Sequence, residues 1–342
     1  MRRAVVDLCS EYPSWSLPTA LIDPVREAFG PGWDVSFVST PSHGRLNDDD
    51  SADERDALYQ GAETYFGWGV RRRVLRAASE TLRWAHTGAT GAGASITPEF
   101  RNCGAVLTNS RGIHAEPVSD WVVAAIGFCA RGFHTAVNAQ GESRWAKRIL
   151  TTLDERLVEF SSLTVGIVGL GGIGTAIARK CAALGMEVRA IRRASDRASP
   201  TEVVWLGGPE DLPALAAESD VLVLALPHTS STAGLVDEST LGALPRGSYV
   251  LNVSRGGILD EAAVLKLLDD GHLGGCVLDV FAKEPLEPEH PFWKHPGVFV
   301  TPHVSAVTDR YWEREVELIV DNVGRYLRGD RLRNVVNLEA GY

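Results

Sequence analysis

The sequence predicts an α/β protein of two domains, the larger of which is a doubly wound parallel sheet. The chain has 342 residues, more than one ordinary core accommodates. From residue 163 onward, short apolar runs alternate with amphipathic stretches, which is the pattern of βαβ units. In the first 110 residues a looser alternation of the same kind indicates a second, smaller α/β domain.

Six apolar runs are the expected strands of the larger sheet. They are LTVGIVG (163–169), MEVRAI (186–191), DVLVLALP (220–227), SYVLNVS (248–254), GCVLDVF (275–281) and VFVTPH (298–303). The segment IGTAIARKCAALG, between the first two runs, has helical spacing and ends at Gly185. The segment DEAAVLKLLDDG, between the fourth and fifth runs, predicts a helix that Asp260 caps and Gly271 ends.

The smaller domain is expected to combine both ends of the chain. Its strands are expected in RRAVVDLC, WDVSFVS, TYFGW, LRWAHTG and AVLTNS, with a helix in GVRRRVLRAASETL. A long, largely apolar helix is expected at 116–133. The tail at 307–330 has a helical period with no strand after it, so it is expected to return to the first domain. The expected division is 1–117 and 306–342 for the smaller domain, and 118–305 for the larger.

Composition excludes several classes of protein. The formal charge of −10 disfavours nucleic acid and anionic membranes as partners. Five cysteines lack metal-ligand spacing, so we expect reduced thiols, no disulfide framework and no metal. We find no signal peptide and no apolar run near 18 residues, and therefore expect a cytoplasmic protein.

The segment GLGGIG (169–174) matches GxGxxG directly after a predicted strand and directly before a predicted helix. Gly169 allows the tight turn, Gly171 leaves room for a pyrophosphate, and Gly174 lets helix and strand pack closely. The helix N-terminus offers N–H groups and a positive dipole end to phosphates. The larger domain is therefore predicted to be a Rossmann-type dinucleotide-binding domain. The alternative is a glycine turn with no ligand.

The segment IRRAS (191–195) occupies the position that selects the cofactor, about 20 residues after the glycine turn. A carboxylate there would accept hydrogen bonds from the ribose hydroxyls of NAD, whereas an arginine pairs with a 2′-phosphate. We therefore expect NADP (NADPH), with NAD as the weaker alternative. In the other interpretation, Arg192 and Arg193 are a solvated strand end and Asp196 holds the ribose.

Three side chains follow predicted strands at the edge where such sheets bind ligands: Arg255, Glu284 and His303. These residue types suit the reduction of a 2-oxo acid. Arginine fixes the substrate carboxylate and polarises the carbonyl, histidine supplies the proton, and a carboxylate orients the histidine. The alternatives are a solvated arginine, Glu287 or Glu289 in place of Glu284, and His290 or His295 in place of His303.

Several blocks resemble those of one family. NVSRGGILDE (252–261), LDVFAKEPL (278–286) and TPHVSAV (301–307), downstream of VGIVGLGGIG, look like the signature blocks of the D-isomer-specific 2-hydroxyacid dehydrogenases. LPHTSSTAGLV (226–236) resembles that family's cofactor-contact loop, and the region 106–122 resembles its interdomain crossing. The resemblance covers nearly the whole chain.

The resemblance implies a dinucleotide domain at 118–305 and a flavodoxin-like substrate-binding domain at 1–117 and 306–342. It implies that Arg255 binds the substrate carboxylate and carbonyl, that His303 is the acid/base, and that Glu284, which precedes proline, is its partner. Within TGAGA (90–94), it points to the N–H groups of Ala92 and Gly93 as donors to the substrate carboxylate, with a plain connector as the alternative. The implied cofactor contacts are Gly169, Gly171, Gly172, Ile173 and Gly174 at the pyrophosphate, Arg192 and Arg193, Pro227 and Thr232 beside the adenosine, Val253, Ser254, Arg255 and His303 near the nicotinamide, and Asp279 at its carboxamide.

Two departures from the family pattern are informative. Ser119-Asp120 replaces an alanine-glutamate pair near the crossing helix, and Arg192 replaces the more common aspartate. Relatives with an arginine there are mostly NADPH-using reductases of glyoxylate and hydroxypyruvate. We therefore expect a homodimeric, NADP-preferring 2-hydroxyacid dehydrogenase that acts mainly as a 2-oxoacid reductase. The alternatives are a dehydrogenase of another small anion, where Glu284 weighs against formate, and a nucleotide-sensing, corepressor-like interaction protein.

Overall fold

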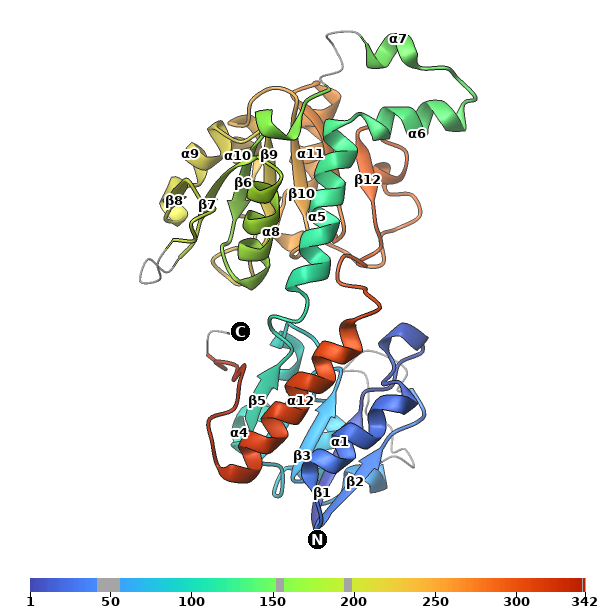
Figure 1. Ribbon diagram of the computed structural model, residues 1–342, viewed down its shortest axis with the longest axis vertical. Coiled ribbons are helices and arrows are strands. Elements are labelled where there is room, and N and C mark those ends of the chain that lie inside the picture. Colours follow the sequence, from blue (N-terminus) through green and yellow to red (C-terminus); the bar gives the residue numbers. More distant parts are fainter. Residues whose placement is uncertain (42–55, 152–156, 194–198, 340, 342) are drawn as a thin grey trace. The chain divides into compact units, whose positions relative to one another are not determined.

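The computed structural model describes residues 1–41, 56–151, 157–193, 199–339 and 341. The chain forms two compact units (Figure 1). The first unit combines Met1–His114 with Val307–Tyr342, and the second is Ala115–Ala306. Each unit holds one sheet, and every pairing between the strands of these sheets is parallel. The predicted fold class is therefore confirmed.

The sheet of the second unit has the order β12-β11-β10-β9-β6-β7-β8, which is the Rossmann arrangement with one added strand. Each of the six predicted runs overlaps a strand. The strand β8 was not predicted, because it has only three residues and none of them is buried. The strands are β6 (Thr164–Val168), β7 (Glu187–Ile191), β8 (Trp205–Gly207), β9 (Val221–Leu224), β10 (Ser248–Asn252), β11 (Leu273–Leu278) and β12 (Val298–Val300).

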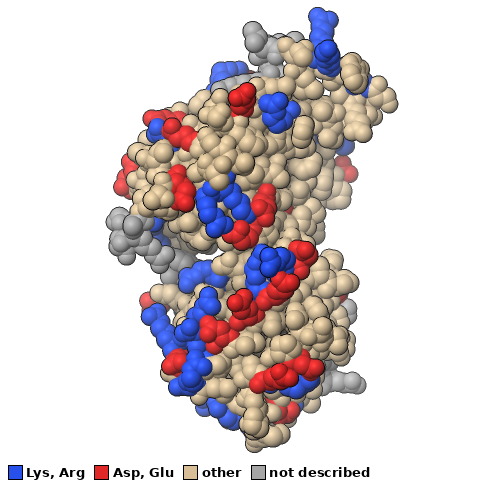
Figure 2. All heavy atoms as spheres, in the orientation of Figure 1, with Lys and Arg blue, Asp and Glu red and all other residues tan. Residues whose placement is uncertain are grey.

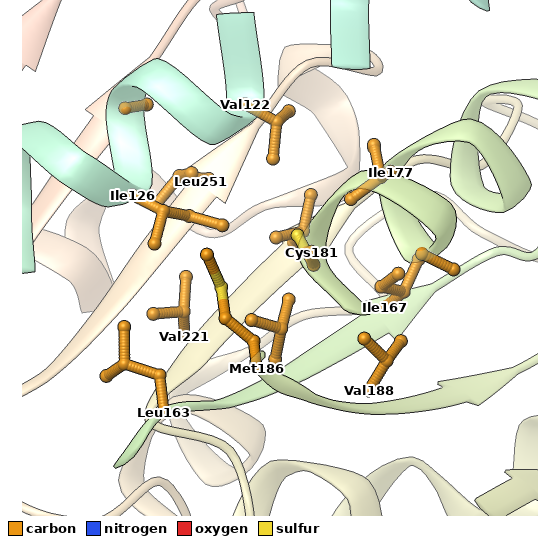
Figure 3. Close-up of a cluster of buried hydrophobic side chains, with 14 of the residues drawn as sticks. Val122, Ile126, Leu163, Ile167, Ile177, Cys181, Met186, Val188, Val221 and Leu251 are labelled. Carbon is orange, nitrogen blue, oxygen red and sulfur yellow. The ribbon is translucent and has the colours of Figure 1, made fainter. Parts of the chain in front are cut away.

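Helices cover both faces of this sheet. On one face lie α5 (Ala115–Ala130) and α8 (Gly172–Ala183), and on the other α9 (Leu212–Ala217), α10 (Glu238–Gly242) and α11 (Glu261–Asp269). Figure 3 shows the core on the first face, where Val122 and Ile126 of α5 meet Ile177 and Cys181 of α8 above the strands. Because both faces of the sheet are buried, the strands are continuous apolar runs in the sequence.

Two local signals of the sequence are confirmed in the second unit. Asp260 caps α11, because its Oδ1 accepts hydrogen bonds from the N–H groups of Ala262 and Ala263, each at 3.0 Å. Gly185 follows α8 with a φ of +86°, a left-handed conformation that glycine adopts readily.

Two short helices, α6 (Phe133–Gly141) and α7 (Lys147–Leu150), extend away from the sheet of the second unit as an arm (Figure 1). The arm exposes large apolar side chains: Phe133 is 56% exposed, Val137 51% and Trp145 90%. Asn138 Nδ2 donates to the carbonyl oxygen of Pro296 at 3.3 Å and so connects the arm to the segment before β12. These helices were not predicted, because they bury little and show no core-facing period.

The sheet of the first unit has the order β2-β1-β3-β4-β5, the flavodoxin-like arrangement. Helices α1 (Ile22–Phe29) and α12 (Tyr311–Arg328) cover one face, and α2 (Asp56–Tyr59), α3 (Arg72–Ala78) and α4 (Pro98–Cys103) the other. The predicted return of the tail is confirmed, since α12 packs on α1 and Val336 N donates to Leu107 O at 2.8 Å. The strands are β1 (Arg2–Asp7), β2 (Trp33–Phe37), β3 (Thr64–Gly67), β4 (Trp84–Thr87) and β5 (Val106–Asn109).

Surface charges are mixed in sign. On the face drawn in Figure 2, basic side chains lie beside acidic ones and do not form an extended patch of one sign. One such group joins α8 to α5: Lys180 Nζ lies 2.5 Å from Asp120 Oδ1 and 3.1 Å from Glu116 Oε2. The aspartate that departs from the family pattern therefore has a defined partner. Among the described residues, no helix is both long and apolar enough to cross a bilayer.

A buried polar network holds α12 against the sheet of the first unit. His86 of β4 and Glu315 of α12 are both fully buried, and His86 Nε2 lies 2.9 Å from Glu315 Oε1. The other ring nitrogen of His86 lies 2.9 Å from Thr108 Oγ1, which also accepts a hydrogen bond from Trp84 Nε1 at 2.8 Å. Buried polar groups are costly unless each has a partner, so this network depends on all of its members.

Replacing His86 with leucine leaves the carboxylate of Glu315 buried beside an apolar side chain. We expect His86→Leu to lower the free energy of unfolding by about 1–3 kcal/mol, the usual cost of leaving a buried polar group without its partner. The double variant His86→Leu/Glu315→Leu should regain most of this loss, because neither leucine needs a polar partner. Urea unfolding followed by tryptophan fluorescence measures both. A double variant as unstable as the single one would contradict this assignment.

Candidate active site

The glycine turn between β6 and α8 has the geometry of an anion site. Gly169 has a φ of +102°, and a side chain at Gly174 would overlap the carbonyl oxygen of Gly169. At Gly171 and Gly172, in contrast, an added Cβ would meet no atom within 4 Å. The first N–H groups of α8 have no acceptor within the helix, so the open side of the turn suits a phosphate. Ile173 packs its side chain on the core.

This turn lies at the point where the strand order reverses. From β6 the chain proceeds to β7 on one side, while β9 lies on the other side of β6. Open α/β sheets bind ligands in the crevice at such a switch point. The loop after β9 flanks it: Thr232 Oγ1 donates to Pro227 O at 2.7 Å and accepts from Thr229 N at 2.8 Å. The Thr232 hydroxyl therefore shapes this loop, and the adenosine contacts of Pro227 and Thr232 stay a prediction.

The two arginines predicted to select the cofactor follow β7. Arg192 N donates to the carbonyl oxygen of Gly207 at 3.1 Å, so pairing with β8 fixes the backbone at this position. The side chain of Arg192 is half-buried and that of Arg193 is exposed. Asp196, the alternative partner of the ribose, lies outside the described residues.

A buried asparagine shapes the loop that carries Arg255. Asn252, at the end of β10, accepts hydrogen bonds on Oδ1 from Ser254 N at 3.0 Å and Ser254 Oγ at 2.7 Å, and its Nδ2 donates to Arg255 O at 3.1 Å. Val253 is buried, whereas Arg255 is exposed and its Nη1 donates to Ser254 O at 2.6 Å. These hydrogen bonds fix the backbone of the loop, and the guanidinium of Arg255 extends from it into solvent.

The structure brings His303 and Glu284 together. The imidazole Nδ1 lies 2.8 Å from Glu284 Oε2, while Glu284 Oε1 accepts a hydrogen bond from Phe281 N at 3.0 Å. An ionised carboxylate only accepts hydrogen bonds, so Nδ1 carries a proton and Nε2 is left to exchange one with a ligand. His303 has a φ of +55°, which costs a residue with a Cβ about 1–2 kcal/mol. The surrounding loop therefore holds this histidine against its backbone preference.

Three of the four competing side chains have other partners. His290 Nδ1 accepts from Phe292 N at 3.3 Å, and His295 Nδ1 accepts from Gly297 N at 3.0 Å, so each shapes a local turn. Glu287 is held by Lys283 at 2.5 Å, and this hydrogen bond lowers the pKa of its carboxyl group. The geometry therefore favours Glu284 and His303 as the pair that could exchange a proton.

Two contacts that sequence reasoning missed connect the Arg255 loop to the Glu284 loop. A side chain at Gly256 would overlap the backbone of Phe281 and Ala282, and Glu261 Oε1 accepts from Ala282 N at 2.8 Å. The loops after β10 and β11 are thus packed backbone against backbone. The only sequence signal was the glycine pair after Arg255, which an ordinary turn would also show.

Two further predicted contacts, Asp279 and the segment of Ala92 and Gly93, lie in different surroundings. Asp279 is fully buried, and its carboxylate accepts hydrogen bonds from the loop that carries His303. In the first unit, Ala92 is buried and Gly93 begins a single 3-10 turn, Gly93–Ser95, in the loop after β4. An added Cβ at Gly93 would meet no atom within 4 Å, so the backbone there is open to a ligand. The roles of all these residues stay predictions.

Comparison with known proteins establishes the family. Residues 123–305 match the NAD-binding domain of the D-isomer-specific 2-hydroxyacid dehydrogenases, and the chain belongs to this family. The resemblance seen in the sequence is thereby confirmed. Glyoxylate/hydroxypyruvate reductase A of Yersinia enterocolitica is 35% identical over 184 residues, which are 54% of this chain and 58% of that protein. The Salmonella paratyphi B protein of the same name is 38% identical over 184 residues, 54% of this chain and 57% of that protein. The chain thus spans less than two thirds of the length of these curated relatives.

Solved structures match along the whole chain. A D-isomer-specific 2-hydroxyacid dehydrogenase from Xanthobacter autotrophicus Py2, in complex with NADPH and MES, has a TM-score of 0.80 and 27% identity, with 99% of each chain covered. An NADPH-dependent glyoxylate/hydroxypyruvate reductase from Sinorhizobium meliloti, in complex with NADP and sulfate, has the same TM-score and identity, with 100% of each chain covered.

Proposed function

We propose that this protein is an NADP-preferring 2-hydroxyacid dehydrogenase that acts mainly as a reductase of small 2-oxo acids such as glyoxylate and hydroxypyruvate. The observation that carries the proposal is the pairing of His303 with Glu284 at 2.8 Å, beside the loop that presents Arg255. All three side chains follow neighbouring strands at the sheet edge where the glycine turn also lies. The names of the relatives and their bound NADP or NADPH support the same reaction.

The residues present fit a dinucleotide. The open side of Gly171 and Gly172 would receive the pyrophosphate at the N-terminus of α8. Arg192 would pair with the 2′-phosphate, since a guanidinium forms short, charge-assisted hydrogen bonds to phosphate oxygens. The loop of Val253 and Ser254 would lie near the nicotinamide. The bound cofactor would supply the hydride that the substrate carbonyl carbon accepts.

The side chains of the second unit would supply the rest of the chemistry. Arg255 would bind the substrate carboxylate bidentately and polarise the carbonyl oxygen, because its planar fork matches both acceptors and stays charged. Protonated His303 would donate from Nε2 to the carbonyl oxygen as negative charge develops there. Glu284 would keep the imidazole in place through its contact with Nδ1. Ala92 and Gly93 remain predicted donors to the substrate carboxylate.

The cofactor preference and the substrate class are tested in one set of initial rates. We expect NADPH to give higher kcat/KM than NADH, and glyoxylate and hydroxypyruvate to exceed pyruvate and bulkier 2-oxo acids. Arg192→Ala should raise KM for NADPH about 10- to 100-fold, the loss of a charge-assisted contact, and leave KM for NADH within a factor of about three. Arg193→Ala, measured in the same way, shows whether the second arginine also contacts the 2′-phosphate.

Arg189→Ala is the matched control for Arg192, because Arg189 lies on β7, the strand that Arg192 follows, and pairs with Glu187 and Glu218. Its KM for NADPH should stay at the wild-type value. Activity confined to NADH would overturn the cofactor assignment. An absence of turnover with either cofactor and every 2-oxo acid would favour the nucleotide-sensing interaction protein.

The acid/base role is tested by removing the imidazole. We expect His303→Ala to lower kcat by about 10²- to 10⁴-fold, the usual contribution of a positioned general acid, with the Kd for NADPH nearly unchanged. His295→Ala is the control, since its ring accepts a local turn hydrogen bond from Gly297 N and lies 3.4 Å from Asp269 Oδ1, and it should keep wild-type kcat. Single-turnover absorbance measures the rate, and fluorescence titration measures the Kd for NADPH. Wild-type kcat in His303→Ala would remove this residue from the reaction.

We further propose that the protein is a homodimer that uses the arm of α6 and α7. An arm that leaves Phe133, Val137 and Trp145 more than half exposed is poorly stabilised in water unless another surface covers it. A second copy of the chain is the partner that the resemblance implies.

The dimer proposal is tested by charging the arm. We expect sedimentation velocity to show a dimer for the wild type and a monomer for Phe133→Glu/Val137→Glu, because two carboxylates would have to be buried in the apolar contact. Val204→Glu, at an exposed apolar position of the same unit, is the control and should remain a dimer. A monomeric wild type at micromolar concentrations would exclude this interface.

A further inference from the structure

The loop after β12 is wrapped around one buried carboxylate. Asp279 directly follows β11, the strand that pairs with β12, and none of its surface is exposed. Its Oδ1 accepts from Thr301 Oγ1 at 2.5 Å and from Val304 N at 2.8 Å, and its Oδ2 accepts from Ser305 N at 2.9 Å. Its main-chain oxygen accepts from His303 N at 2.9 Å. One residue therefore holds the loop at four points.

These contacts explain how His303 keeps its left-handed backbone. Successive N–H groups that converge on an anion form a concave nest, and such a nest requires a left-handed residue within it. Here the N–H groups of Val304 and Ser305 converge on the carboxylate of Asp279, and His303, with φ +55°, is the left-handed residue. The carboxylate thus takes the place that a bound anion occupies in other nests.

The same short segment also fixes the partner of His303. Glu284 Oε1 accepts from Phe281 N, two residues after Asp279, while Glu284 Oε2 contacts His303 Nδ1. The end of β11 therefore positions the histidine through the carboxylate of Asp279 and the glutamate through the N–H of Phe281. The 2.8 Å separation between the His303 imidazole and the Glu284 carboxylate depends on this shared segment of backbone.

We propose that Asp279 is a positioning residue for His303, which it holds through the backbone of the 301–305 loop. The proposal rests on the proposed function, in which His303 is the acid. The family resemblance also assigns this aspartate to the nicotinamide carboxamide. In the structure, three hydrogen bonds from the loop reach the carboxylate, and Oδ2 accepts only one of them.

The proposal is tested with Asp279→Asn, which keeps the size of the side chain. An amide offers only one acceptor oxygen, so its NH₂ group must face one of the N–H or O–H donors that the carboxylate now accepts from. We expect kcat to fall on the order of 10- to 100-fold, the effect of displacing a reacting group by about 1 Å. The Kd for NADPH should stay within a factor of about two.

Two variants separate positioning from other roles. Thr301→Val removes one hydrogen bond to Asp279 without changing the carboxylate, and it should lower kcat in the same direction but less. Asp237→Asn is the matched control, because Asp237 also accepts a backbone N–H, from Thr240 at 2.9 Å, where it caps α10 away from this loop. It should keep wild-type kcat, whatever its effect on stability.

The outcomes are distinct. A tenfold rise in the Kd for NADPH with unchanged kcat in Asp279→Asn would assign the residue to the cofactor and overturn the proposal. Wild-type values in both Asp279→Asn and Thr301→Val would also overturn it, and Thr301→Val alone decides if the first variant does not fold. If the wild type itself lacks activity, the proposed function fails, and the downfield NMR signal of the His303 Nδ1 proton, assigned with His303→Ala, becomes the readout. Loss of this NMR signal in Asp279→Asn supports the positioning role of Asp279, and persistence of the signal overturns the proposal.

Discussion

Parallel strand pairing is the constraint on which the rest of this structure depends. Two parallel neighbours can be joined only by a crossover, and the crossover helices cover both faces of the sheet. The strands then lie between two apolar layers, so polar groups are largely confined to the ends of the strands. Because β10, β11 and β12 are neighbours and run in the same direction, the loops after them meet at one edge. Arg255, Glu284 and His303 are close to one another for that reason, although the first and the last are 48 positions apart in the sequence.

Features encoded within a few residues could be predicted from the sequence. The six long strands, the glycine turn, the Asp260 cap and the returning tail all produce local patterns of polarity or backbone freedom. The strand β8 and the arm of α6 and α7 could not be predicted in this way. A three-residue edge strand buries too little to produce an apolar run, and Ala139 alone is buried among the residues of α6 and α7, which is too few to produce a helical period.

The partner of a buried polar side chain is harder to predict, because it is chosen by the fold and not by the neighbouring sequence. The three glutamates after β11 have the same chemistry, and only Glu284 is placed to contact an imidazole while Glu287 contacts a lysine. Asp279 shows the same limit, since its carboxylate is satisfied by a loop about 25 residues further along the chain. The type of each side chain indicates what it can bind, whereas its hydrogen bonds in the structure determine what remains for a ligand.

The discontinuous first unit has a consequence for the order in which the chain can fold. The second unit is one continuous segment and is complete once residue 306 has been synthesised. The first unit lacks α12 until residue 328 has been synthesised, and until then α1 alone covers this face of its sheet. The buried contacts of His86 with Glu315 join residues 229 positions apart, so this layer closes last. The segment made first is therefore the one that waits longest for its core, with its apolar face open to other chains in the meantime.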